Sequence, residues 1–565
     1  MDDAPTVVGI NRTQDASIAV ARGRSRVASL QKERLTRRKH HWGRLGDVRD
    51  RYLPSLPELR EPVDLVVECY SSDTEVANRD AYHQELAESL RFRGEMRVEQ
   101  VSHHLAHLYS AFHPSPFDAA AVMVIDAQGS RVRDISERFP DAAAAAPDLL
   151  EIASFYDCDR DGRADCIGKQ LWDGDWNRPA GLGCFYYLLT RMIFPTGEGN
   201  EGKVMVLAPF GRRGALGLPE LVVDEYRVLI PDEWRELFAE RDERFLVPTG
   251  NGASIDDSAN LAAAGQHAFE SALLRVARWL AEETGRTDLC YAGGAALNCS
   301  ANGRLVRESA FRGVFIPPSP HDGGTAVGCA LYGMIGVLGR PSDFRWSHDF
   351  LGPELEEAAL EATLGEAGDD LVVERPDDLL ERVVEILDGG GVVAVHSGRS
   401  ESGPRALGNR SILADARHPA MQDHINFHVK GREWFRPLAP IVLLGAAPAI
   451  FDIDRPSPFM QIAADVRPEY REQLPAITHV DGTARLQSVE AESTPFLHAL
   501  LERFEERTGC PVLLNTALNG KGDPLTETPA DSLECFRTTA MHALVLPPFL
   551  VRKRDEPPRV ARSEA

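Results

Sequence analysis

Residues 101–129 read VSHHLAHLYSAFHPSPFDAAAVMVIDAQG, in which a histidine-containing segment leads into the apolar run AAAVMVI and then Asp126. His103 and His107 are four residues apart, so both imidazoles lie on one face if the segment is helical. An apolar run that ends in Asp is typical of a buried strand that presents a carboxylate at a sheet edge. Two imidazoles and a carboxylate are ligands suited to Fe(II), Mn or Zn. The alternative is a surface helix with unrelated histidines, and the HxxxH spacing alone does not separate the two.

Two glycine turns further along the chain favour a nucleotide-binding domain. YAGGAALN at 291–298 places Gly293 and Gly294 after a strand, where glycine lets backbone N–H groups approach a phosphate. PPSPHDGGTAVGCA at 317–330 carries Asp322 at another expected helix start. The chain opens with VVGINRTQDASIAV, which predicts a strand, a polar turn and a second strand. This order predicts an α/β fold whose residues 1–345 form an actin- or sugar-kinase-like (ASKHA) nucleotide-binding domain.

A second, smaller α/β domain is expected after an acidic linker. Residues 346–375 are rich in Asp and Glu and are predicted to form a linker helix. DDLLERVVEILDGGGVVAVHSGR then gives a helix, a glycine turn and a buried strand, which open a domain over residues 376–552. Residues 553–565 are expected to be a flexible tail.

The composition indicates a soluble enzyme. The 565 residues exceed the size at which single cores stop growing, and 43% of them are hydrophobic. No stretch approaches the roughly 18 apolar residues of a membrane span, and the start MDDAPTVVGI lacks the pattern of a secretory signal. The nine cysteines form no CxxC pair, which argues against a zinc ribbon and favours a reducing compartment. We therefore expect a cytoplasmic protein that does not act at a membrane.

The net charge argues against a nucleic-acid partner. Asp and Glu number 86 against 62 Lys and Arg, so the formal charge is −24 at pH 7. Such a field repels an RNA backbone, although it does not forbid a local basic patch.

Nine sequence blocks, in a fixed order, resemble the ATP-dependent O-carbamoyltransferases of nodulation-factor and antibiotic biosynthesis. The N-terminal half of that family is similar to the tRNA threonylcarbamoyl-transfer protein, and its C-terminal half is similar to the YrdC-like synthase of threonylcarbamoyl-adenylate. The resemblance covers nearly the whole chain and rests on GIN…DAS near residue 9, ERLTRRK at 33–39, HHLAH at 103–107, NEGKVMVLAPFG at 200–211, AGGAALNCSANG, SPHDGGTAVG, ESGPRALGNRSI at 401–412, VKGREWFRPLAP at 429–440 and LNTALN at 514–519.

The resemblance implies two half-reactions in two domains. The YrdC-like C-terminal domain would make carbamoyl-adenylate from carbamoyl phosphate and ATP, with Mg²⁺ accompanying ATP. The N-terminal domain would transfer the carbamoyl group to a hydroxyl, or an amine, of a small specialised metabolite, and a homodimer is compatible with this scheme. The implied metal, with Fe²⁺ favoured over Mn²⁺ or Zn²⁺, would be held by His103, His107, Asp126 and Asp322.

Further site residues follow from the matched blocks. Arginine side chains, which can form two parallel hydrogen bonds, and a lysine suit anionic donors such as ATP and carbamoyl phosphate. His396 and Asp415 are expected to be structural. Catalytic roles are expected for Gln14, Asp15, Lys39, Arg405 and Arg436. Substrate or nucleotide binding is expected for Gly129, Lys203, Gly293, Gly294, Asn298, Lys430, Arg432, Asn515 and Thr516.

The chain departs from the family pattern at three positions. Relatives place His where this chain has Gln14, and an amide has no site that titrates near neutral pH. Either another group such as Asp15, or the acceptor itself, supplies the base, and we expect Gln14 to contact the acceptor. Ala127 stands where a glycine is usual, and Ala517 removes a hydroxyl from the expected carbamoyl-phosphate pocket.

Other interpretations stay open at the level of sequence. A tRNA-modifying enzyme and a non-catalytic regulator derived from a transferase are the alternative functions, and a sugar kinase would have no use for residues 376–550. The acidic stretch from Asp157 to Asp165 has calcium-loop spacing, but the closing Glu is replaced by Gly168. A β-hairpin with an Asp-Gly turn is the alternative for that stretch.

Overall fold

The chain folds into two compact units in a computed structural model that describes residues 4–71, 76–194, 199–248 and 254–560. Unit 1 comprises Met1–Lys32 and His40–Trp346, and unit 2 comprises Glu33–Lys39 and Ser347–Ala565. The main division therefore falls one residue after the boundary expected at 345. The short segment Glu33–Lys39 belongs to unit 2, although the sequence places it in the first domain. Both units are mixed α/β, so the α/β class expected from the sequence is confirmed.

The first sheet of unit 1 combines a β-meander with parallel strands. Its central strand β1 pairs antiparallel with β2, which pairs with β3, and pairs parallel with β4, which pairs with β5. β1 and β4 are buried along their whole length, as expected for strands covered on both faces. The order across the sheet is β3 (Arg26–Gln31), β2 (Ser17–Arg22), β1 (Thr6–Asn11), β4 (Leu65–Cys69) and β5 (Val98–Val101).

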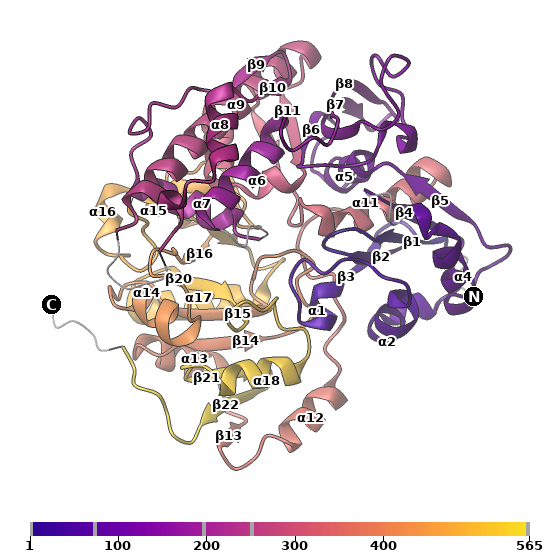
Figure 1. The fold of residues 1–565 in the computed structure, drawn as a ribbon. Coiled ribbons are helices and arrows are strands. Elements are labelled where there is room, and N and C mark those ends of the chain that lie inside the picture. The colour runs from indigo at the N-terminus through magenta and orange to yellow at the C-terminus, as the bar shows by residue number, and fades with distance from the viewer. Residues whose placement is uncertain (1–3, 72–75, 195–198, 249–253, 561–565) are drawn as a thin grey trace. The chain divides into compact units, whose positions relative to one another are not determined.

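The second sheet of unit 1 repeats the connectivity of the first. Its central strand β6 pairs antiparallel with β7, which pairs with β8, and pairs parallel with β11, which pairs with β12. The order is β8 (Ala164–Trp172), β7 (Leu150–Asp159), β6 (Ala119–Ile125), β11 (Asp288–Ala292) and β12 (Gly313–Phe315). Unit 1 thus contains two sheets with the same order and the same strand directions (Figure 1).

Two buried helices of unit 1 pack against each other between these strands. α5 (His103–Ala111) follows β5, and α11 (Thr325–Tyr332) lies against both α5 and β1. Gly9 allows the close approach, because a Cβ there would lie 2.1 Å from the carbonyl oxygen of Ala326. The remaining helices of unit 1 that the site requires are α4 (Arg79–Ser89), α6 (Gly181–Ile193), α7 (Glu201–Leu207), α9 (Asp256–Thr284) and α10 (Cys299–Glu308).

Unit 2 is built on one eight-stranded mixed sheet. Helices α13 (Leu379–Asp388), α17 (Pro495–Thr508) and α18 (Pro529–Arg537) pack against its strands. The order is β13 (Leu371–Glu374), β22 (Phe549–Lys553), β21 (Ala543–Leu546), β14 (Val393–His396), β15 (Arg410–Asp415), β20 (Val512–Ala517), β16 (Ala439–Leu443) and β19 (Gln487–Val489).

The linker and the tail are more ordered than the sequence suggests. The predicted linker contains helix α12 (Glu357–Gly365), but it also contains β13, which pairs antiparallel with β22. The described part of the tail packs on unit 2, because Arg554 donates a backbone hydrogen bond to Asp370 and Val560 to Gly390. Val560 is buried, so the tail is packed at residue 560.

Across the described residues, none of the helices combines the length and apolarity that crossing a bilayer requires.

Candidate functional site

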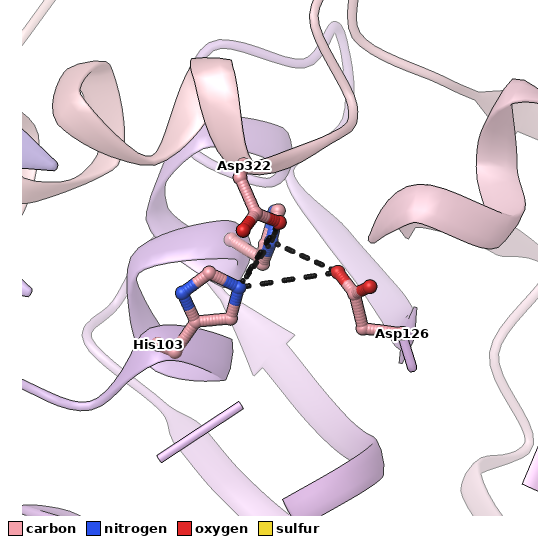
Figure 2. A group of neighbouring side chains, drawn as sticks. His103, Asp126 and Asp322 are labelled. Carbon is pink, nitrogen blue, oxygen red and sulfur yellow. Dashed lines mark hydrogen bonds and ion pairs between the residues drawn. The ribbon is translucent and has the colours of Figure 1, made fainter. Parts of the chain in front are cut away.

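Three elements of unit 1 bring the four expected metal ligands together. α5 carries His103 and His107 one turn apart, Asp126 follows the last residue of β6, and Asp322 opens the short helix η7 (Asp322–Gly324) before α11. Both imidazoles are fully buried, and the carboxylates are 13% and 18% exposed. Figure 2 shows the carboxylates of Asp126 and Asp322 directed at the ring of His103.

The ligand atoms surround a single point. Nε2 of His103 lies 3.2 Å from Nε2 of His107 and 3.3 Å from Oδ1 of Asp322. Nε2 of His107 lies 3.5 Å from Oδ2 of Asp126. All four atoms lie within 4.8 Å of one another. Two ring nitrogens that face each other beside two carboxylates form the N₂O₂ set that Fe²⁺, Mn²⁺ and Zn²⁺ accept, so these residues fit such an ion.

The electrostatics of the four residues are strongly coupled. Burial alone lowers the pKa of His103, but the charges and hydrogen bonds of Asp322 and Asp126 outweigh it and raise that pKa well above its usual value. Burial raises the pKa of Asp126, but the hydrogen bonds of His103 and His107 bring it well below its usual value. The carboxylates therefore stay ionised and favour positive charge at the histidines. A divalent cation would supply that charge in place of the protons.

A buried ion network fixes the N-terminus of α5. Oε1 of Glu151 accepts the backbone N–H groups of His104 and Ser130 at 3.0 and 3.1 Å. Oε2 of Glu151 accepts from Lys169 at 2.6 Å, and Ser154 bridges Lys169 and the ring of His104. Gly129 makes room for this network, because a Cβ there would lie 2.8 Å from Cγ of Glu151. The two histidines of the proposed metal site therefore lie on a helix whose start is held by charge.

The glycine turn after β11 lies against a ligand carboxylate. The backbone N–H of Gly294 donates to Oδ2 of Asp126 at 3.0 Å. Gly293 has φ +93°, and a Cβ there would lie 2.2 Å from the carbonyl oxygen of Ile125. Asn298 caps α10, since its Oδ1 accepts from the N–H of Ala301. Lys203, on α7, has its ammonium 5.2 Å from the ring centre of Phe194. Nucleotide binding by these residues remains a prediction.

The loop after β1 is tied to the metal ligands. Nδ2 of Asn11 donates to the carbonyl oxygens of Gln14, Asp15 and Asp322. Oδ1 of Asp15 accepts a hydrogen bond of 2.9 Å from Nδ1 of His40. Sequence reasoning missed His40, although its place directly after the ERLTRRK block was a usable signal.

The ERLTRRK segment lies in unit 2, where its arginines hold loops. Arg34 donates to the carbonyl oxygen of Gly403, and Arg37 donates to those of Pro524 and Leu525. Lys39 belongs to the same unit and lowers the pKa of Lys430 by its charge, after burial and Arg432. The sequence expected Lys39 to serve the first domain, so the structure moves it to the other unit.

Three arginines form the cationic cluster of unit 2, which comprises Arg432, Arg436 and Arg485. Burial lowers the pKa of Arg432 to about 9, and the charges of Arg436 and Arg485 add to that effect. Burial likewise lowers the pKa of Arg436. A neighbouring Glu433 opposes these effects only in part. Half-buried guanidinium groups that repel one another are typical of a site for phosphate anions. Sequence reasoning missed Arg485 because no matched block contains it.

Other expected residues of unit 2 build the loops around that cluster. Lys430 donates to the carbonyl oxygens of Ala517 and Asn519 and to the Asn519 side chain, which uses all three donors of its ammonium group. Asn515 donates to Ala406, next to Arg405. Thr516 pairs with β15 and is half-buried. Phosphate binding by these side chains stays a prediction, and the contacts of Lys430 favour a structural role.

The loop that carries Arg405 is organised by a buried carboxylate. Oε1 of Glu401 accepts the backbone N–H groups of Leu407, Asn409 and Arg410. These three bonds fix the backbone of residues 407–409, which form no repeating secondary structure, and the start of β15.

His396 and Asp415, which are expected from the sequence to be structural, both make contacts in the interior of unit 2. His396 pairs with Ser532 at 2.7 Å, and Asp415 holds Arg417 at 2.6 Å.

The Asp157–Asp165 stretch forms the turn region of the β7–β8 hairpin. Asp157 pairs with Arg286 and Arg163, and Asp165 pairs with Arg163. Oδ1 of Asp159 accepts two backbone N–H groups of the turn. Because these carboxylates are neutralised by arginines or occupied by the turn, the hairpin interpretation accounts for them.

Comparison with known proteins shows the family of this chain. The family description "Carbamoyltransferase N-terminus" matches residues 74–331, and "Carbamoyltransferase C-terminus" matches residues 384–553. The nodulation protein NolO of Bradyrhizobium diazoefficiens is 34% identical over 480 residues, which are 80% of this chain and 79% of that protein. The nodulation protein NolNO of Sinorhizobium fredii is also 34% identical, over 82% of this chain and 65% of that protein.

Among solved structures, HypF of T. kodakarensis aligns with a TM-score of 0.37 and 13% identity. The alignment covers 60% of this chain and 48% of the HypF chain. This similarity is too distant to add to the fold described above. The two family descriptions and the relatives confirm the resemblance that the nine sequence blocks indicate. This chain belongs to the carbamoyltransferase family.

Proposed function

We propose that this protein is an ATP-dependent O-carbamoyltransferase that makes carbamoyl-adenylate and transfers its carbamoyl group to a small hydroxyl compound. Membership of the carbamoyltransferase family supports the transfer of a carbamoyl group. The observation that carries the finer proposal is the division of charge between the units. Unit 1 holds the imidazole–carboxylate cluster, and unit 2 holds the cationic cluster. Each suits one half-reaction.

The cationic cluster suits the first half-reaction, because both donors are anions. Water first displaces phosphate from carbamoyl phosphate and gives carbamate. A carbamate oxygen then attacks the α-phosphorus of ATP, pyrophosphate leaves, and carbamoyl-adenylate forms. Arg432, Arg436 and Arg485 would neutralise the charge that develops on the phosphates, and Arg405 would add a further cation. The eight-stranded mixed sheet is the basis on which we assign a YrdC-like fold to unit 2.

The imidazole–carboxylate cluster suits the second half-reaction. The acceptor oxygen attacks the carbamoyl carbon, the bond from that carbon to the phosphate oxygen breaks, and AMP leaves. His103, His107, Asp126 and Asp322 would hold a divalent metal, most favourably Fe²⁺, which supplies Lewis-acid stabilisation to the leaving phosphate. The turn at Gly293 and Gly294 would bring backbone N–H groups to the adenylate. The repeated sheet supports an ASKHA-type fold for unit 1.

The acceptor and the setting are also part of the proposal. The net charge of −24 disfavours RNA and leaves a small metabolite as the acceptor. All nine cysteines lie in the described part of the chain and none forms a disulfide there, which suits the cytoplasm.

The test is product analysis after incubation with ATP, Mg²⁺ and carbamoyl phosphate. We expect AMP and pyrophosphate, and, with a panel of hydroxyl metabolites, a product heavier by one carbamoyl group in place of a hydrogen. ADP in place of AMP would point to a kinase and overturn the proposal. Absence of any nucleotide product under these conditions would favour a regulator.

A further inference from the structure

A carboxylate–imidazole pair lies beside the metal ligands and has no part in holding them. Nδ1 of His40 and Oδ1 of Asp15 are 2.9 Å apart. The carboxylate of Asp15 is 10% exposed, whereas the ring of His40 is 33% exposed. A buried carboxylate therefore holds a partly exposed imidazole.

Both residues of the pair have a left-handed backbone. Asp15 and His40 each have φ +53°, a region that side chains other than glycine seldom adopt. Such conformations cost about 1–3 kcal/mol each and cluster at functional sites.

The pair is fixed next to the ligand Asp322. Nδ2 of Asn11 donates to the carbonyl oxygen of Asp15 at 3.3 Å and to that of Asp322 at 3.0 Å. Nε2 of His321, the residue before Asp322, lies 4.0 Å from Oδ2 of Asp15. The same asparagine side chain thus sets the positions of the pair and of a metal ligand.

We propose that His40 is the general base that takes the proton of the acceptor hydroxyl, with Asp15 as its positioning residue. Donation of Nδ1–H to Asp15 selects the tautomer in which Nε2 is the basic nitrogen. Nε2 takes the hydroxyl proton as the acceptor oxygen bonds to the carbamoyl carbon and AMP leaves. Asp15 then stabilises the imidazolium. This inference rests on the proposed transferase function and supplies the base that Gln14 cannot be.

The test compares two small alcohols that differ in acidity, methanol and trifluoroethanol, as acceptors of the carbamoyl group. A general base matters most for the weakly acidic methanol, since trifluoroethanol gives up its proton more readily. His40→Asn is the matched change, because asparagine tolerates φ +53°, still offers a donor to Asp15 and has no basic nitrogen. We expect transfer to methanol to fall about 100-fold or more and transfer to trifluoroethanol to fall much less. Asp15→Asn should follow the same pattern.

The control is His267→Asn, which should keep wild-type transfer to both alcohols. His267 is also paired with a carboxylate, Glu220 at 3.0 Å, and its side chain is 30% exposed. Equal losses for the two alcohols in His40→Asn, or no loss for either, would overturn the assignment of His40. Pyrophosphate release in the same samples reports on the proposed function. If the wild type releases no pyrophosphate, the proposed function fails, whatever the alcohols show.

Discussion

The histidines of α5 take different roles because their surroundings differ. His103 and His107 face two carboxylates, which raise the pKa of each despite burial. His104 points to the other side, where burial and then the charge of Lys169 hold its pKa well below the usual value. Its Nδ1 pairs with Ser154 at 2.7 Å. His103 and His107 are therefore placed to bind a metal, whereas His104 is uncharged and bonds to Ser154.

Removal of one ligand imidazole should abolish tight metal binding. Substitutions outside the direct ligand set already cost roughly 10–100-fold in metal affinity, so His107→Ala should lose more than that. Metal content after reconstitution with Fe²⁺, measured by elemental analysis, tests this. His267→Ala, which removes a half-buried histidine of α9 outside the cluster, should bind like the wild type. Unchanged metal content in His107→Ala would remove the basis for the site.

Glu68 should govern part of the acid stability of unit 1. Burial raises its pKa, but Arg12 at 2.7 Å, His83 and Tyr70 outweigh burial and bring the pKa to about 2, from 4.5 in an unfolded chain. A depressed pKa gives stability that is present above pH 4.5 and is lost as the pH falls towards 2. The shift corresponds to about 3 kcal/mol.

Denaturant unfolding between pH 2 and pH 7 measures this contribution. The free energy of unfolding of Glu68→Gln should lie below that of the wild type at pH 7, and the two should converge towards pH 2. Glu88→Gln, on the exposed side of α4, should keep the wild-type pH dependence. A constant difference between Glu68→Gln and the wild type over this range would show that the carboxylate does not titrate as described.

At the scale of elements, α5 depends on the strands β7 and β8 behind it. Glu151 on β7 accepts the N–H of His104, and Lys169 on β8 neutralises Glu151 and Glu137. Neither Glu151 nor Lys169 is exposed. This network fixes the ligand helix through side chains that are distant in sequence.

Breaking this network should destabilise the protein and weaken the metal site together. Lys169→Met leaves Glu151 buried without its cation, which costs about 3–5 kcal/mol in the free energy of unfolding. Urea unfolding measures that loss, and Fe²⁺ titration should show reduced affinity, because the start of α5 shifts. Arg24→Ala removes an exposed pair with Asp343 and should change neither quantity. Wild-type stability in Lys169→Met would mean that the network is not required.

The segment that begins in helix α1 (Lys32–Thr36) shows how one element serves both units. Lys32 belongs to unit 1, where it pairs with Asp47 at 2.7 Å. Arg34 and Arg37 belong to unit 2, where they bind loop carbonyl groups. The seven residues Glu33–Lys39 thus belong to unit 2, although the rest of that unit begins more than 300 residues later, at Ser347.

For the whole molecule, the sequence pattern predicted those features that depend on neighbouring residues, namely strands, helices and glycine turns. The apolar run before Asp126 and the spacing of His103 and His107 gave a strand and a helix, which the structure contains. Glycine turns marked Gly293 and Asp322 because close backbone approach requires glycine nearby. The main division between the units was predicted to within one residue from the change in composition.

Long-range contacts could not be predicted in this way. Nothing local indicates that His40 meets Asp15, that Arg485 joins Arg432, or that β13 completes a sheet with β22. Each of these contacts depends on the closure of a loop between distant segments, and periodicity carries no information about loop closure. The backbone of Lys39 groups with unit 2 for the same reason, although the residue lies within the range expected for the first domain.

The central claim is that the two half-reactions belong to different units, and pyrophosphate release by two variants tests it most directly. Arg436→Ala should lose pyrophosphate release from ATP and carbamoyl phosphate, by about 10²–10³-fold, since a preorganised charge at the reacting phosphate is removed. His103→Ala should release pyrophosphate and accumulate carbamoyl-adenylate, but should not pass the carbamoyl group to an acceptor. If His103→Ala stopped pyrophosphate release as completely as Arg436→Ala, the two half-reactions would share one site and the account would be contradicted.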